Sequence, residues 1–397
     1  MTSSRPTVKI RPGKGRRLAD GAPWAFADEV AMDRRTKGLA PGALVHLVEG
    51  ERNFGLAAFN PRSKIPARLI DPDPDAAVDQ DWFAGRLSKA LSMRDTLFDA
   101  PFYRLVHAEA DLLPGLVIDR FGGALVIQPN AAWVEARLDD LIAASVEVTG
   151  CETVVINASS RTRGLEGLES YTRIARGDLD GPVEVPMNGA IYLADLTGGQ
   201  KTGLFYDQRP NHAFASSLAQ GGRVLDIFSH VGGFALAALA AGASQAVAVD
   251  SSAAALDLAG DAAARMGVME RFEIRQGDAF KTLEAMAGEE ARFDMVVCDP
   301  PAFAPNKASL PQGLRAYERI ARLAAPLVAP GGWLVLCSCS HAADAESFRR
   351  ACANGLRAAG RAAQLVHSGR AGPDHPQHPY LAENSYLKAL FFRMLDG

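Results

Sequence analysis

The sequence predicts an α/β chain whose C-terminal half is a doubly wound parallel sheet, preceded by a small β-rich domain and a central α+β domain. From about residue 190, short apolar runs alternate with alanine-rich helical stretches, which is the pattern of a parallel sheet covered by helices. A chain of 397 residues is also longer than a single domain with one hydrophobic core usually is, which predicts two or three domains. The acidic stretch DPDPDAAVDQD (71–81) is typical of a linker that closes a first domain.

Three domains follow from these observations: residues 1–72, 73–188 and 189–397. In the first, ALVHLVEG and FGLAAFN predict two strands around a turn, and PARLI predicts a third. In the second, helical periodicity marks DWFAGRLSKALSMRDTLF and AAWVEARLDDLIAASVEV. Strands are expected in FYRLVHAE, LVIDRFGGALVIQ and ETVVINAS, so this domain is α+β.

The third domain predicts five strands that alternate with helices: RVLDIF, QAVAVD, RFEIRQGD, FDMVVCD and WLVLCSCS. At its end, RAAQLVHSG and SYLKALFFRML are two strands separated only by a loop, which predicts an antiparallel pair closing a seven-stranded sheet. Ligands of such sheets bind at the carboxyl ends of the strands, where acidic residues cluster in this sequence.

The cysteine content and the lack of a recognisable secretory or membrane segment predict a cytoplasmic protein. The five cysteines are an odd number and scattered, which indicates reduced thiols. Cys337 and Cys339 lie close together, but nothing nearby completes a set of zinc ligands, so no metal site is expected. The basic N-terminal residues lack the apolar core of a secretory signal. No uncharged apolar run reaches the roughly 20 residues that span a bilayer, so no membrane partner is expected.

The net charge of −4 is unevenly distributed. Residues 1–70 carry 13 Lys and Arg against 6 Asp and Glu, whereas residues 71–189 carry 10 against 20. The basic excess suits a small module that docks on RNA phosphates, with candidate contacts at Arg11, Lys14, Arg16 and Arg17. A solvated basic face would explain the charge equally well.

Polar residues and glycines at three successive strand ends predict a nucleoside cofactor. In VLDIFSHVGGF, Asp226 ends a strand, and Gly232 and Gly233 open the next helix, where the backbone lets a ligand approach. Asp250 could take two ribose hydroxyls, and Asp278 could reach an adenine amine. Each feature alone is more often structural, because a strand-end Asp commonly caps a helix. The missing third glycine argues against a dehydrogenase.

VLDIFSHVGGF, AVAVDSS, GDAF and CDPPAF, in that order, resemble the motifs of class I S-adenosylmethionine methyltransferases. With LPGLVIDRFGG, TGGQKTGLFYDQRPNH, APWAF and AAFNPRSKIPARL, nearly the whole chain resembles the bacterial 23S rRNA 5-methylcytosine methyltransferases. The resemblance implies a PUA-like RNA-binding domain (1–72), a central EEHEE domain, a Rossmann-like methyltransferase domain and the cofactor S-adenosyl-L-methionine. It also implies that a homodimer can form. In the family, KTGLFYDQR flanks the cofactor, which implies pocket residues Lys201, Phe205, Gln208 and Arg209; a core aromatic is the alternative for Phe205.

The string FDMVVCDPPAF predicts the site of the target base. Two prolines fix the backbone and remove two donors, so nearby carbonyls are free to face a ligand. Asp299 could grip the N3/N4 edge of cytosine, and Pro300, Pro301 and Phe303 are predicted to contact the base. A turn-forming Asp-Pro is the structural alternative.

Methylation of cytosine C5 requires a thiolate that adds at C6, and WLVLCSCSHAADAESF offers one. Strand alternation points Cys337 and Cys339 to one face, but only Cys339 reaches the carboxyl end of the strand. The family pattern also favours the cysteine of Ser-Cys-Ser. Cys337 and Cys298 fit buried core residues. Related enzymes often carry a second cysteine where this chain has Ala302, so the group that removes the C5 proton is open.

The sequence thus predicts transfer of a methyl group from S-adenosylmethionine to C5 of a cytosine in 23S rRNA, naked or partly assembled, through a covalent Cys339–C6 adduct. One alternative is a methyltransferase acting on an exocyclic amine, such as guanine N2, which needs no thiol. The other is a non-catalytic RNA-binding protein on a methyltransferase scaffold.

Overall fold

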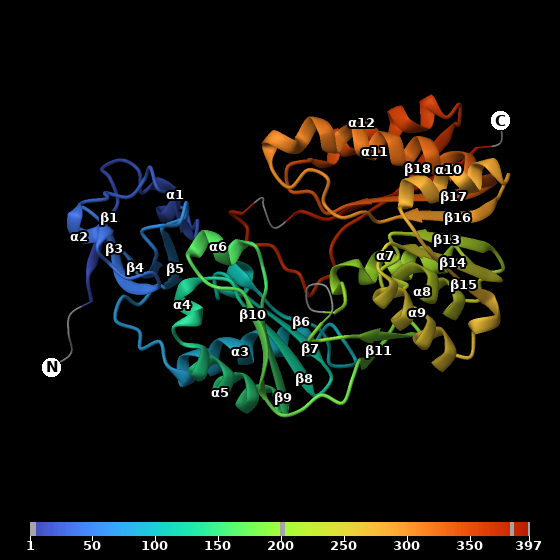
Figure 1. Cartoon of the computed structure of the whole chain (residues 1–397). Helices are drawn as coiled ribbons and strands as arrows, with labels where there is room; N and C mark the ends of the chain where they lie inside the picture. Colours follow the sequence, from blue (N-terminus) through green and yellow to red (C-terminus); the bar gives the residue numbers. More distant parts are fainter. Residues whose placement is uncertain (1–4, 199–202, 382–384, 396–397) are drawn as a thin grey trace. The chain divides into compact units, whose positions relative to one another are not determined.

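A computed structural model describes residues 5–198, 203–381 and 385–395 (Figure 1). The chain forms two compact units. Unit 1 comprises residues 1–181, 195–203 and 373–384, and unit 2 comprises the remainder. No helix in the described part of the chain is long and apolar enough to cross a membrane.

Unit 1 begins with a five-stranded sheet of order β1-β3-β4-β5-β2. Its core contains Val45, Leu47 and Phe59, which are fully buried. The three predicted strands are present, and two very short strands flank them. The elements are β1 (Thr7–Lys9), α1 (Arg16–Ala19), β2 (Trp24–Ala25), α2 (Arg34–Lys37), β3 (Ala43–Glu49), β4 (Arg52–Phe59) and β5 (Ala67–Asp71).

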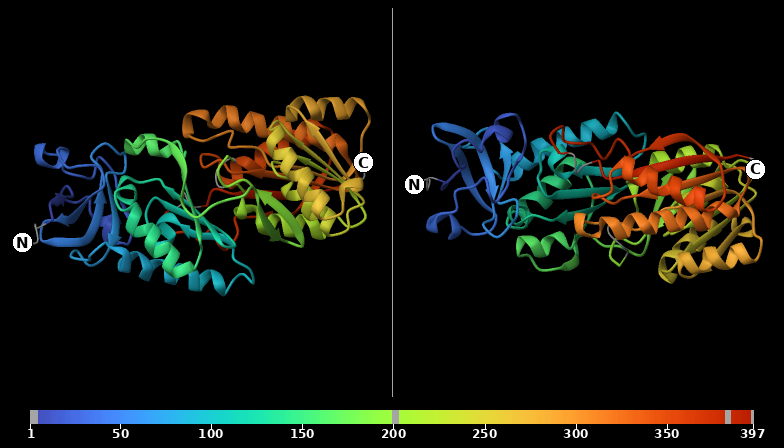
Figure 2. Two further views of the ribbon diagram at one scale, coloured as in Figure 1. Left: turned by 60° about the horizontal axis from the view of Figure 1, so that its bottom comes forward. Right: turned by 90° about the horizontal axis from the view of Figure 1, so that it is seen from above.

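A second, separate sheet completes unit 1, with order β10-β9-β8-β7-β6 (Figure 2). The apolar faces of its helices bury aromatic rings, and the rings of Phe83 and Trp133 stack with centroids 6.0 Å apart. The predicted second helix is split near Arg137. The elements are α3 (Gln80–Asp95), β6 (Phe102–His107), β7 (Leu116–Phe121), β8 (Ala124–Pro129), α4 (Ala132–Glu135), α5 (Leu138–Thr149), β9 (Thr153–Ala158), α6 (Thr162–Glu166) and β10 (Tyr171–Arg176).

A buried ionic cluster ties residues 373–381 into unit 1. The Arg94 side chain is fully buried, and its guanidinium donates to both carboxylate oxygens of Asp111, at 2.6 and 2.8 Å. It also donates to the backbone carbonyls of Arg104 and Asp374, at 2.9 and 3.0 Å. The Asp374 carboxylate accepts from the Arg104 backbone N–H at 3.0 Å. A segment near the C-terminus therefore supplies part of the core of unit 1.

Unit 2 contains the predicted doubly wound, seven-stranded sheet, which the structure confirms with order β15-β14-β13-β16-β17-β19-β18. Strands β13 to β17 are parallel, and β19 runs antiparallel to both neighbours. The predicted antiparallel pair is thus β18 and β19. The strands are β13 (Arg223–Ile227), β14 (Gln245–Asp250), β15 (Phe272–Gln276), β16 (Phe293–Cys298), β17 (Val328–Ser338), β18 (Ala363–Gly369) and β19 (Lys388–Met394).

Helices cover both faces of this sheet (Figure 1). One face carries α7 (Arg209–Ser217), α8 (Gly233–Ala240) and α9 (Ala253–Arg265), and the other carries α10 (Ala279–Gly288), α11 (Leu310–Ala324) and α12 (Ala345–Ala358). A hairpin of β11 (Val183–Met187) and β12 (Ala190–Ala194) packs on α8 and α9. Short 3-10 helices are Ala108–Asp111, Tyr206–Gln208, Met269–Arg271, Lys307–Ser309 and Ala325–Leu327.

Candidate active site

The turn between β13 and α8 requires glycine at two positions. Gly232 has a φ of +80°, and a Cβ there would lie 3.1 Å from the Leu236 side chain. A Cβ on Gly233 would lie 2.8 Å from His212 Nε2. Two other residues of the turn, Phe228 and His230, also have positive φ values, of 65° and 50°. The positive φ values and the two glycines give this turn a strained backbone at the carboxyl end of β13, where a nucleotide-like ligand binds in such folds.

The buried Asp226 carboxylate stabilises this turn by hydrogen bonds to the backbone of α8. Its side chain is fully buried, and Oδ2 accepts from the backbone N–H groups of Phe234 and Ala235, at 3.1 and 3.0 Å. Burial raises the pKa of this carboxyl to about 7. Within the described residues, its buried Oδ1 has no hydrogen-bond partner. Asp226 therefore fixes the start of α8, and its predicted cofactor contact stays a prediction.

Replacing Asp226 with asparagine is expected to remove a pH-dependent loss of stability. Because the folded-state pKa is raised, the folded protein binds more protons than the unfolded chain between pH 4 and 7, so stability falls as pH rises. Between pH 5 and 8, wild type should lose roughly 2.5 kcal/mol of unfolding free energy relative to Asp226→Asn. Urea unfolding at both pH values, without ligand, measures this. An unchanged difference between the two proteins would contradict it.

Two further acids stand at neighbouring strand ends. Asp250, at the end of β14, accepts from the His230 N–H at 2.9 Å and from the Ser252 N–H at 2.9 Å. A carboxylate has about four lone-pair sites, so acceptor capacity remains for ribose hydroxyls. Asp278 is exposed after β15 and caps α10 by accepting from the Lys281 N–H at 2.9 Å. The structure thus brings Asp226, Asp250 and Asp278 to adjacent strands, and the last serves as a helix cap.

Residues of the KTGLFYDQR string flank the same turn. Lys201 lies outside the described residues. The Phe205 ring contacts the His230 ring, with centroids 5.0 Å apart. Gln208 is buried and accepts from the Asn211 side chain at 2.6 Å. Arg209 begins α7, and its guanidinium lies 5.4 Å from the Tyr206 ring centroid. Phe205 therefore reaches the β13–α8 turn through His230.

Sequence reasoning missed two residues that support this turn. His212 is fully enclosed, and burial lowers its pKa to about 3, so it is neutral. Its ring packs on Phe234, with centroids 4.4 Å apart, and its Nδ1 has no partner in the described part of the chain. The Tyr192 hydroxyl donates to the Gly233 carbonyl at 3.0 Å. Only the position of His212 in the family-like string could have indicated it.

The Asp-Pro-Pro turn follows β16 directly. The Asp299 N–H donates to the Ile227 carbonyl at 3.2 Å, which ties the turn to β13. Pro300 is buried, whereas Pro301 is exposed. The half-buried Phe303 ring packs against Tyr317, with centroids 5.1 Å apart. The turn is thus rigid and lies at the same edge of the sheet as the β13–α8 turn.

Cys339 differs from the other cysteines in its exposure. It follows β17 and is half-buried, whereas the other four are buried. Burial raises the pKa of the Cys298, Cys337 and Cys352 thiols, so these are poor nucleophiles. The Cys339 Sγ lies 4.0 Å from the Pro300 carbonyl oxygen, which brings the predicted nucleophile to the predicted base-binding turn.

A buried hydroxyl cluster fixes the residues on either side of Cys339. The Tyr317 hydroxyl lies 2.8 Å from Ser338 Oγ and 2.7 Å from Ser340 Oγ, and both pairs are hydrogen-bonded. Ser340 Oγ also accepts from the Ala304 N–H at 2.9 Å. The cluster joins α11, the end of β17 and the segment after Asp-Pro-Pro. It therefore holds the backbone that presents Cys339.

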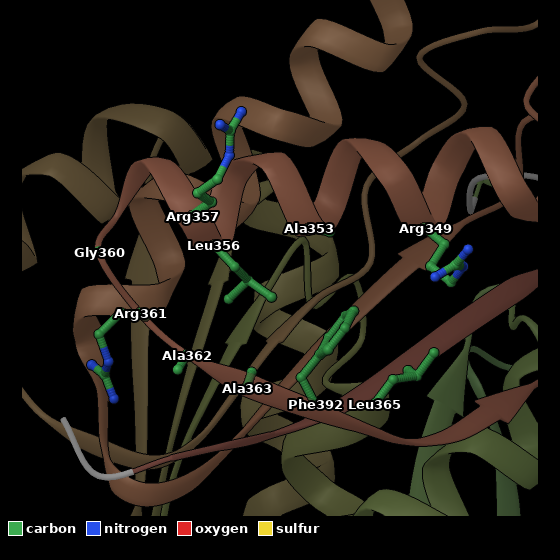
Figure 3. A pocket seen from close by; sticks show the side chains of 10 residues that line it. All are labelled: Arg349, Ala353, Leu356, Arg357, Gly360, Arg361, Ala362, Ala363, Leu365 and Phe392. Atoms are coloured by element: carbon green, nitrogen blue, oxygen red, sulfur yellow. The ribbon is translucent and has the colours of Figure 1, made fainter.

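Two other surfaces of the described chain have a shape or charge that suits a ligand. A groove of about 530 Å³ lies between the end of α12 and β18, with Leu356 and Phe392 among its lining residues (Figure 3). It contains none of the predicted site residues. In unit 1, the four basic residues proposed to contact RNA are exposed: Arg11, Lys14, Arg16 and Arg17.

Comparison with known proteins places the chain among methyltransferases. A family model described as S-adenosylmethionine-dependent methyltransferase matches residues 169–393, and a PUA-like domain model matches residues 8–72. A ribosomal RNA large subunit methyltransferase I from Erwinia tasmaniensis is 34% identical, covering 98% of this chain and 100% of that one. A ribosomal RNA large subunit methyltransferase from Deinococcus radiodurans is 35% identical, covering 99% and 98%.

Solved structures share the fold at low identity. A methyltransferase crystallised with SAH superimposes with a TM-score of 0.82 at 19% identity, covering 98% of this chain and 99% of that one. A SAM-dependent methyltransferase from Streptococcus mutans gives a TM-score of 0.82 at 18% identity, covering 98% and 100%. Both matches extend over nearly the full length of this chain.

Proposed function

The chain belongs to the S-adenosylmethionine-dependent methyltransferases of large-subunit ribosomal RNA, and from this premise we propose that it methylates C5 of a cytosine in 23S rRNA. The proposal includes a covalent adduct between Cys339 and C6 of the base. The observation that carries it is the half-buried Cys339 Sγ, 4.0 Å from the Pro300 carbonyl oxygen of the Asp-Pro-Pro turn.

The residues of the β13–α8 turn fit S-adenosylmethionine, which supplies a methyl group on a sulfonium. Side chains at Gly232 or Gly233 would collide with their neighbours, so glycine is needed at both positions and no Cβ there keeps a ligand from the backbone. Two buried polar atoms beside the turn, Asp226 Oδ1 and His212 Nδ1, have no partner among the described residues. Buried polar groups are normally satisfied, which supports a polar ligand here. We propose that Asp250 binds the ribose and that Asp278 binds the adenine amine, with Phe205, Gln208, Arg209 and Lys201 lining the pocket.

Replacing Asp250 with alanine is expected to weaken S-adenosylmethionine binding by roughly 10- to 100-fold. The change removes hydrogen bonds to a charged acceptor, worth about 1.5–3 kcal/mol, and it also releases the His230 N–H that shapes the turn. Isothermal titration calorimetry gives the dissociation constants. The control is Asp257→Ala, which removes an exposed acid from α9. Equal affinity of Asp250→Ala and wild type would remove Asp250 from the pocket.

At the target side, we propose that the carboxyl of Asp299 receives the N3/N4 edge of cytosine. Pro300 and Pro301 keep the backbone rigid, and Phe303 packs beside the base. The flipped or unpaired base would then present its C6 to Cys339. Charged and exposed residues near the N-terminus of unit 1 would hold the RNA by its phosphates.

Cys339 acts as the nucleophile in this proposal. Its thiolate forms a bond to C6, which makes C5 an enamine carbon able to take the methyl group. Loss of the C5 proton then restores the C5–C6 double bond and expels the thiolate. Methylation of an exocyclic amine would need no such step. That alternative gives no role to the half-buried thiol of Cys339 beside the Asp-Pro-Pro turn.

Trapping with 5-azacytidine tests the adduct. RNA containing this base has nitrogen at position 5 and no proton to lose, so the Cys339–C6 bond should persist. Wild-type protein and Cys352→Ala should yield a covalent protein–RNA band with S-adenosylmethionine, and Cys339→Ala should not. Absence of the band with wild type would refute the covalent mechanism.

The chemical identity of the modified nucleoside shows which atom of the target base receives the methyl group. Total RNA from a strain lacking the protein is incubated with the enzyme and S-adenosylmethionine, digested, and examined by nucleoside mass spectrometry. We expect 5-methylcytidine from 23S rRNA. Formation of N2-methylguanosine instead would establish the exocyclic-amine alternative.

A further inference from the structure

A buried lysine lies beside the proposed nucleophile. Lys388 begins β19 and pairs in register with Ser338 of β17, the residue before Cys339. Only 9% of Lys388 is exposed. Lysine is almost never buried to this extent unless its ammonium has partners. In the described part of the chain, Lys388 forms no ion pair with a carboxylate within 4 Å.

The hydrogen bonds of Lys388 are directed to the segment that follows Cys339. Its Nζ donates to the carbonyls of Ser340 and Ala343, both at 2.7 Å. An ammonium has three N–H donors, so these two bonds leave one donor. Among the described residues, Nζ makes no other hydrogen bond, so one N–H of the ammonium is not used by the backbone.

Electrostatics couple the lysine to the thiol. Burial lowers the pKa of Lys388 to about 8, and its interactions with Cys339 and Asp344 oppose this shift by favouring the ammonium. The interaction is reciprocal, because an ammonium that gains from a nearby thiolate favours that thiolate equally. Asp344 is exposed and also caps α12, so it is well solvated. Other titratable groups near the pair are Tyr317 of α11, whose pKa is raised by burial and by Cys339, and His341, whose ring lies 5.4 Å from that of Tyr386.

We propose that Lys388 is the positioning residue that keeps Cys339 ionised, with the lysine ammonium as the counter-ion of the thiolate. Below about pH 8 Lys388 is already an ammonium, so the thiol proton passes to water and the thiolate that remains pairs with the existing positive charge. Two N–H groups of the ammonium hold the carbonyls of Ser340 and Ala343, on the segment that directly follows Cys339, which keeps the positive charge beside the sulfur. The use of this thiolate in attack on C6 rests on the proposed function, but the ion pair itself does not.

Alkylation of Cys339 measures the ion pair directly. Full-length protein, without RNA or S-adenosylmethionine, is treated with iodoacetamide from pH 6 to 10, and carboxamidomethyl-Cys339 is quantified by peptide mass spectrometry. Since the thiolate is the reactive form, the rate reports ionisation. For Lys388→Met, the inflection should move up by at least one pH unit, and the rate at pH 7 should fall about tenfold. Lys388→Arg keeps the positive charge and should stay within about threefold of wild type.

The control variant is Lys89→Met, which removes an exposed lysine from α3 and should leave the profile unchanged. A wild-type profile in folded Lys388→Met would overturn the proposal. If that variant does not fold, wild type decides the matter: its Cys339 must ionise at lower pH than the same residue in urea-unfolded protein, and equal inflections overturn the proposal. Because the assay contains no RNA, failure of azacytidine trapping with a shifted profile refutes only the proposed function.

Discussion

Replacing Cys339 with serine is expected to lower methyl transfer to rRNA by roughly 10⁴-fold or more, the scale seen when an enzyme loses its covalent nucleophile. A serine hydroxyl is not ionised near neutral pH and cannot add to C6. Because Cys339 follows β17 and the glycine turn follows β13, S-adenosylmethionine affinity should change less than threefold. Transfer of tritiated methyl groups to rRNA, with calorimetry for the cofactor, measures both quantities.

The matched control is Cys352→Ser, a thiol-to-hydroxyl change in the core of α12 that should reduce stability but not the rate per folded molecule. Retention of at least one tenth of wild-type turnover by Cys339→Ser would show that the thiol is not the nucleophile. That result would favour methylation of an exocyclic amine, for which Asp299 and the two prolines suffice.

The second large effect concerns stability in unit 1. Arg94→Ala is expected to lower the free energy of unfolding by about 3–5 kcal/mol. The variant leaves the Asp111 carboxylate largely buried without its bidentate partner, and it also deprives the carbonyls of Arg104 and Asp374 of a donor. Urea unfolding of the full-length chain, followed by tryptophan fluorescence, gives the difference.

An exposed arginine provides the control for this measurement. Arg349 pairs with Glu346 at 2.7 Å, but both side chains are more than half exposed. Such surface pairs contribute about 0–1 kcal/mol, so Arg349→Ala should change stability by less than about 1 kcal/mol. Similar losses for Arg94→Ala and Arg349→Ala would mean that the buried cluster contributes no more than a surface pair.

Long apolar runs made the large sheet predictable. Strands β13, β14 and β16 are largely buried on both faces, so their sequences are mostly hydrophobic. The edge strand β15 alternates apolar and polar residues instead. Short strands such as β1 and β2 carry too few residues for a periodic signal. The predicted boundary after residue 188 falls inside the turn of the β11–β12 hairpin. The Asn-Gly pair at 188–189, between two apolar runs, was the signal for that hairpin.

Some residues of the candidate site could be predicted from the sequence, and others could not. Residues at strand ends, such as Asp250 and Cys339, could be placed because their positions follow from the strands alone. Tyr317, His212 and Lys388 could not, because their partners are distant in sequence. Lys388 faces the segment after Cys339 only because β19 pairs antiparallel with β17 in one register. A lysine at the start of the apolar run ALFF was the single available signal.

The order of the chain through the two units has a consequence for biosynthesis. The chain passes between the units after residues 181, 194, 203, 372 and 384. When a ribosome has made the first 200 residues, Arg94 and Asp111 are present, but the Asp374 carbonyl that completes their buried cluster is not. The nascent N-terminal half therefore lacks part of its final core until almost the whole chain has been translated, and a product ending before residue 374 would leave the buried Arg94 guanidinium without its Asp374 acceptor.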